Sequence, residues 1–108
     1  MIAMTLQDFD RTLKTVCPQT YEGTAPQGAR RFLCWHCYGA QSSYGDNRNV
    51  FDLPKVQLDI LTQSTTDDLV DEVCQALGAA GLTYAVMDPG TYDPDYNAIR
   101  TILQLVVI

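Results

Sequence analysis

The stretch KVQLDILTQSTTDDLVDEVCQALGAAGL, residues 55–82, combines a strand pattern with the helix pattern that follows it. In its first part, apolar Val56, Leu58 and Ile60 alternate with polar residues, which is the two-residue period of a strand with one buried face. From Leu69 onward, the apolar positions follow the 3.6-residue spacing of a helix, with acidic residues mainly on the other face. The stretch therefore predicts a strand followed by an amphipathic helix, and it contains no motif that carries chemistry.

On either side of this stretch, the same reasoning predicts a second helix and several further strands. Thr5 is a cap-like residue before an apolar stripe, so a helix is expected over residues 5–16, ended by Pro18. The economical fold is one α+β domain over residues 1–108, a mostly antiparallel sheet of about four to five strands with two helices packed on one face. The other expected elements are a short edge strand near Tyr21, strands at residues 31–38, 50–62, 82–87 and 98–108, a turn at residues 88–90, and loops at residues 39–49 and 92–97.

Composition and charge exclude several classes of protein. The net charge is −6, which would repel phosphate backbones and disfavours a nucleic-acid-binding role. The hydrophobic fraction is 46%, and no segment approaches the roughly 18 apolar residues of a membrane-spanning helix. The first residues lack the basic and apolar segments of a signal peptide, so we expect cytoplasmic synthesis.

The four cysteines suggest either ordinary core thiols or a metal or thiol site. Cys34 and Cys37 form a Cys-x-x-Cys pair, which can be a redox couple or half of a zinc site. A strand would point the two thiols to opposite faces, and further ligands from Cys17, Cys74 or His36 would have irregular spacing. We therefore expect reduced, mostly buried thiols, and a small cytosolic zinc- or thiol-binding protein that uses Cys34 and Cys37 is the alternative.

No residue pattern indicates catalysis. His36 is the single histidine, and no serine or carboxylate stands in a recognisable triad arrangement with it. The chain also has no glycine-rich phosphate loop and no nucleophile elbow. We therefore expect a protein that is not an enzyme, with no catalytic residues, no cofactor and no bound metal.

Several pieces of the chain, taken in order, resemble a family of small phage proteins. These pieces are MTLQDF (residues 4–9), FLCWHCY (32–38), GDNRNV (45–50), VQLDILT (56–62) with the acidic helix after it, and AGL (80–82). The family is that of the tail terminator or tail-completion proteins of long-tailed bacteriophages and prophages. The similarity spans nearly the whole length. This chain differs from the family pattern in its cysteine-rich strand and in its apolar end at residues 105–108.

The resemblance implies an assembly role. It implies an α/β fold that forms a ring, commonly a hexamer, which stops growth of the tail tube and joins it to the head connector. Such a protein would work in the host bacterial cytoplasm during assembly and then in the virion tail, where DNA passes without being specifically bound. We expect no membrane partner, and the family has no catalytic residues to transfer. A neighbouring neck or head-completion component is a further alternative.

A ring needs two different contact patches on each subunit, because its interfaces are head-to-tail. An extended hairpin arm from the passage at residues 39–54 could supply one patch, and the apolar final strand could pair with a neighbour at its edge. The residues expected at the partner interface are Tyr44, Asp46, Asn47, Arg48, Phe51, Leu105 and Val107.

Overall fold

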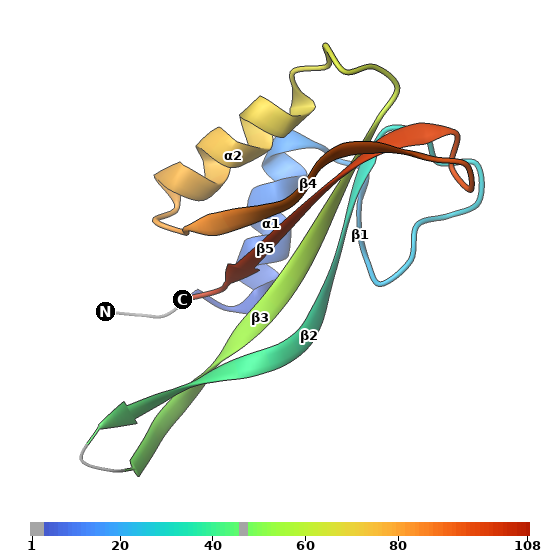
Figure 1. Cartoon of the computed structure of the whole chain (residues 1–108). Helices are drawn as coiled ribbons and strands as arrows, with labels where there is room; N and C mark the ends of the chain where they lie inside the picture. The colour runs from blue at the N-terminus through green and yellow to red at the C-terminus, as the bar shows by residue number, and fades with distance from the viewer. Residues whose placement is uncertain (1–3, 46–47) are drawn as a thin grey trace.

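The chain folds into a five-stranded sheet with two helices (Figure 1). The structure is a computed structural model that describes residues 4–45 and 48–108, with side chains described outside residues 41–52. Neither helix in this described part is long and apolar enough to cross a membrane. The elements are α1 (Leu6–Val16), β1 (Thr20–Glu22), β2 (Phe32–Gly45), β3 (Arg48–Thr62), α2 (Leu69–Ala79), β4 (Tyr84–Asp93) and β5 (Ala98–Val106).

The strands lie in the order β1-β2-β3-β5-β4. β1 runs parallel to β2, and the other three pairs are antiparallel. The predicted α+β class is therefore confirmed, and the mostly antiparallel sheet largely fits, with one parallel pair at its edge. The short edge strand near Tyr21 is also confirmed, as β1.

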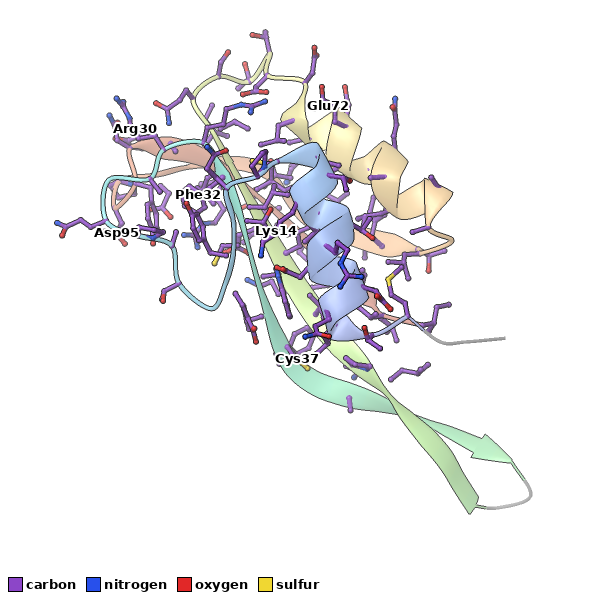
Figure 2. All side chains as sticks on the ribbon, turned by 180° about the vertical axis from the view of Figure 1, so that it is seen from behind. Lys14, Arg30, Phe32, Cys37, Glu72 and Asp95 are labelled. Carbon is purple, nitrogen blue, oxygen red and sulfur yellow. The ribbon has the colours of Figure 1, made fainter. Side chains whose placement is uncertain are left out.

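Both helices cover the same face of the sheet, as Figure 2 shows from behind. α1 begins where the sequence predicts it, because Thr5 and Asp8 form a reciprocal capping box: Asp8 N donates to Thr5 Oγ1 at 3.0 Å, and Thr5 N donates to Asp8 Oδ2 at 3.2 Å. The apolar stripe of α1 buries Phe9 and Leu13, and that of α2 buries Leu69, Val73 and Leu77. These side chains pack on the alternating residues of the central strands, so the predicted buried face of residues 56–60 is confirmed: Val56, Leu58 and Ile60 are all fully buried.

The opposite face of the sheet is covered only at one end. There, Phe32, Leu61 and Ala98 form a small second cluster, with Tyr21 and Tyr96 among the partly buried side chains against it. Further along the same face, His36 and Tyr38 are exposed, and their rings lie 6.4 Å apart. Within the described residues, much of this face is open.

Two predicted connections are wrong. The expected loop at residues 39–49 is largely strand, because β2 continues to Gly45 and β3 begins at Arg48; residues 46 and 47 lie outside the described part. The expected turn at residues 88–90 lies inside β4, which absorbs it through irregular pairing with β5. In both places, turn-forming residue types occur in strand backbone that has a free edge, where their poor strand propensity costs little.

Candidate functional site

The most distinctive feature of the fold is a hairpin arm, defined as residues 39–45 of β2 and residues 48–53 of β3. β1 pairs with β2 only as far as Trp35, and β5 pairs with β3 only from Lys55. The last contact before the arm is the bond from Val107 N to the carbonyl oxygen of Pro54, at 2.9 Å. Beyond it, the two described strands pair only with each other, and they project from the sheet (Figure 1).

The arm lengthens the molecule, whose extents are 49 × 24 × 23 Å. Its pairing is regular from Gly39 opposite Lys55 to Ser43 opposite Phe51, and register shifts lie on both sides of this run. Figure 2 labels Cys37 close to the point where the arm leaves the sheet. A two-stranded ribbon is marginal in water on its own, so the arm is the part of the chain that would gain most from a partner.

Five of the seven expected interface residues lie partly or wholly outside the described part, and the other two lie in the core. The side chains of Tyr44, Arg48 and Phe51 lie outside the described residues, although their backbone belongs to the arm, and Asp46 and Asn47 lie wholly outside the described part.

The expectation that Leu105 and Val107 lie at a partner interface is wrong. They are 5% and 1% exposed and belong to the main core, because β5 lies between β3 and β4. Their side chains therefore face the helices of their own subunit. The expectation that the final strand pairs at its edge with a neighbour is also wrong, because both edges of β5 are already paired.

The free edge of the sheet is β4, which the sequence reasoning missed as a surface. Six large hydrophobic side chains are exposed among the described residues, and four of them lie in β4: Tyr84 (38%), Val86 (54%), Met87 (56%) and Tyr92 (59%). The signal was present in residues 82–87, where apolar residues follow one another without polar alternation. An exposed apolar edge strand is a ready template for pairing with another chain.

The second half of β4 is less suited to pairing than the first. Register shifts occur between Val86 and Asp88 and again between Asp88 and Thr91. Pro89 has no N–H to offer, and Gly90 has a φ of +145°, outside the usual strand region. Bulges and proline are the devices that commonly protect a sheet edge, so the segment available for pairing is the first half of the strand.

Asp88 holds this irregular segment in place. Its Oδ1 accepts a bond from Gly90 N at 3.0 Å and another from the Thr91 hydroxyl at 2.9 Å. These two bonds lower the pKa of Asp88, the backbone bond most strongly. The bulged conformation is therefore specified by local hydrogen bonds.

A charged cluster lies on the sheet face opposite the helices. Arg100 on β5 pairs with Asp59 on β3 at 3.4 Å and also with Asp93 at the end of β4. Gln57 donates a further bond to Asp59 at 3.0 Å. The cluster connects the centre of the sheet to the end of β4, and its carboxylates are already engaged by Arg100, so its role is structural.

The cysteines do not come together. Cys34 Sγ donates to the Gly23 carbonyl and Cys37 Sγ to the Gly39 carbonyl, both at 3.2 Å, and all four thiols are free. Burial raises the pKa of Cys34, which keeps it as a thiol. Only Cys17 is buried, whereas Cys34 and Cys74 are half-buried and Cys37 is exposed, so the expectation of mostly buried thiols is wrong. No group of three metal-ligating side chains occurs among the described residues.

A cleft of about 390 Å³ lies between α1 and the β1 side of the sheet. Its main charged group, Asp10, accepts a bond from Trp35 Nε1 at 2.9 Å and pairs with Lys14 at 2.8 Å. Burial alone would raise the pKa of Asp10, but these hydrogen bonds outweigh it and lower the pKa. Asp10, Lys14 and Trp35 thus satisfy one another, and the second carboxylate of the cleft, Glu22, is exposed.

The candidate functional site is therefore a pair of surfaces, the hairpin arm and the first half of the β4 edge. Both offer backbone groups that can pair with another chain. No protein-family model matches the chain, and no curated protein matches its sequence.

Proposed function

We propose that this protein is a structural component of virion assembly, a tail terminator that caps the head-proximal end of a phage tail tube and joins it to the head connector. The observation that carries the proposal is the hairpin arm, which projects beyond the subunit's own core. A protein that acts alone has little use for such an arm, whereas a subunit of a ring can place it on a neighbour. The ordered sequence resemblance to tail-completion proteins points to the same role.

The two surfaces suit a ring. The arm and the β4 edge are different patches on different elements, as head-to-tail contacts require. A second copy of the chain is therefore the first partner, in a ring that is commonly a hexamer in the resembled family. The tail tube protein and the head connector are the further partners.

The charge of the subunit suits a ring through which DNA moves. Its net charge of −6 would be multiplied by the number of subunits, which disfavours retention of a phosphate backbone. The acidic residues are not equivalent, however. Asp67 is held by Arg31, and Asp93 by Arg100, whereas Asp71 and Glu72 on α2 are exposed and form no ion pair among the described residues.

The alternative of a zinc- or thiol-binding protein has less support. Cys34 packs in the small cluster around Phe32, whereas Cys37 is exposed three residues later on the other face of the strand. A single zinc ion would require both thiols on one side. Metal analysis of the purified protein would revive this alternative if it found stoichiometric zinc.

The experiment that tests the proposal combines native mass spectrometry with electron microscopy. The purified protein should form a closed ring, and the ring should bind the ends of tail tubes assembled from the tube protein of the same phage. A monomer that leaves tube ends bare would contradict the proposal. Rings that bind isolated head connectors but not tube ends would favour the neighbouring neck position.

A further inference from the structure

We propose that the first half of β4, residues 84–87, receives the hairpin arm of a second copy as an added strand, paired along residues 39–43 of that arm. This inference rests on the proposed ring and names the surface that builds it. It commits to one occupant, a second copy of this chain.

Few backbone edges are free in the described residues. β1 is three residues long, and its far side offers too few groups for stable pairing. β3 and β5 are paired on both sides within the sheet. The long free edges are those of β4 and of the arm.

The first half of β4 exposes an apolar surface. Three exposed large side chains, Tyr84, Val86 and Met87, fall within four consecutive residues, and α2 does not bury them. Cross-strand contacts with an added strand would cover them, because paired strands lie about 4.8 Å apart and side chains on the same face touch.

The β4 edge and the arm each offer only a short run of regular backbone. The irregular pairing from Val86 onward and the missing N–H of Pro89 limit the regular part of the β4 edge to its first half. The arm has its own short regular run, from Gly39 to Ser43, which is also bounded by register shifts. Each bulge would stop the pairing at its own side, which fixes the register of the contact.

Symmetry favours pairing of the arm with β4 over pairing of β4 with β4. Pairing of β4 with β4 of a second copy would give a closed two-fold dimer, because the same patch is used on both subunits. That arrangement would leave both arms as unsupported ribbons. Pairing of arm with β4 uses each patch once, and it allows the next subunit to be added in the same way.

The test compares two variants with the same change of charge. Val86→Asp places a carboxylate in the proposed contact, and Tyr92→Asp places one in the bulged half of the same strand, at a position that is similarly exposed (54% and 59%). Thermal unfolding of each variant, followed by far-UV circular dichroism, establishes that it is folded. Native mass spectrometry then gives the oligomeric state, and hydrogen–deuterium exchange locates the buried amides.

We expect Val86→Asp to be a folded monomer and Tyr92→Asp to assemble like the unchanged protein. On assembly, amides in residues 84–87 and 39–43 should both gain protection, at least tenfold in exchange rate, relative to the Val86→Asp monomer. A ring that persists in Val86→Asp, or forms without protection of residues 84–87, would overturn this inference and leave the proposed function standing. A dimer protected at residues 84–87 but not at 39–43 would show β4–β4 pairing and overturn it. A protein that remains monomeric without any substitution would overturn both.

Discussion

Trp35 is the side chain whose replacement tests the packing of α1 on the sheet most directly. It is 3% exposed, its ring lies edge-on to Phe9 at 5.6 Å, and its Nε1 donates to Asp10 Oδ1 at 2.9 Å. Trp35→Phe keeps an aromatic ring beside Phe9 and removes the bond to Asp10. The variant therefore separates the hydrogen bond from most of the apolar packing.

The expected loss follows from two contributions. A hydrogen bond to a charged group contributes about 1.5–3 kcal/mol, and the lower end applies here because the Asp10 side chain is 23% exposed and can rehydrate. The smaller ring leaves a void that costs about 1 kcal/mol more. We expect the free energy of unfolding to fall by about 2–3 kcal/mol at pH 7, or roughly 10 °C in Tm for a domain of this size.

The assay is urea unfolding followed by far-UV circular dichroism, since the only tryptophan is removed. A double-mutant cycle with Asp10→Ala should give a coupling energy of about 1.5 kcal/mol. The pKa of folded Asp10 is lowered, so the stability contributed by its ionised form is present above about pH 4 and is lost as the pH falls through the folded pKa. The difference between Trp35→Phe and the unchanged protein should therefore shrink on acidification. Additive single effects, or a difference that stays constant as the pH falls through the folded pKa of Asp10, would refute the reasoning.

Three other substitutions test separate parts of the fold. Leu58→Ala, at a fully buried position under the helices, should lower the free energy of unfolding by about 3–4 kcal/mol in a urea titration, and a loss below 1 kcal/mol would show that this core is not tightly packed. Thr5→Ala removes the capping bond of α1 and should cost about 1 kcal/mol, whereas the conservative Thr5→Ser should cost much less. Arg31→Gln removes a bidentate pair with Asp67 (2.8 and 3.0 Å) and should cost about 1 kcal/mol at pH 7. Because Arg31 is what chiefly lowers the pKa of Asp67, that cost should be present above about pH 4 and vanish as the pH falls through the folded pKa; a cost that persisted at pH 2 would contradict the assignment.

The elements that could be predicted from sequence are those with one buried face. The alternation of Val56, Leu58 and Ile60 and the stripe that contains Phe9 and Leu13 both arise because one side of each element meets the core. Burial of one face makes apolar residues recur at the spacing of the strand or helix, and this spacing is visible in the sequence. The capping residue Thr5 adds a second local signal, which fixed the start of α1.

A hairpin arm over residues 39–54 was suggested, but residues 39–49 were predicted as a loop because no such constraint acts on them. Over residues 39–45 and 48–53, the backbones of β2 and β3 pair with no third strand. The sequence there shows no alternation and contains Gly, Ser and Asn, which are typical of a loop. The assignment of Leu105 and Val107 to an interface failed for another reason. Strand order is set by pairing between distant segments. The sequence of residues 98–108 alone does not indicate that β4 will form the sheet edge beyond β5.

The position of β5 also determines when the fold can be completed. β2 and β3 are neighbours along the chain, and a hairpin of this kind closes within about 1–10 μs. β3 must then wait for β5, which follows α2 and β4 in sequence, and β4 has no strand to pair with in the described sheet until β5 arrives. During synthesis, the growing chain therefore exposes the unpaired edges of β3 and β4 until β5 has been made. Pairing between such distant segments is slow, on the order of milliseconds to seconds, and the interval is when chains are most prone to associate wrongly.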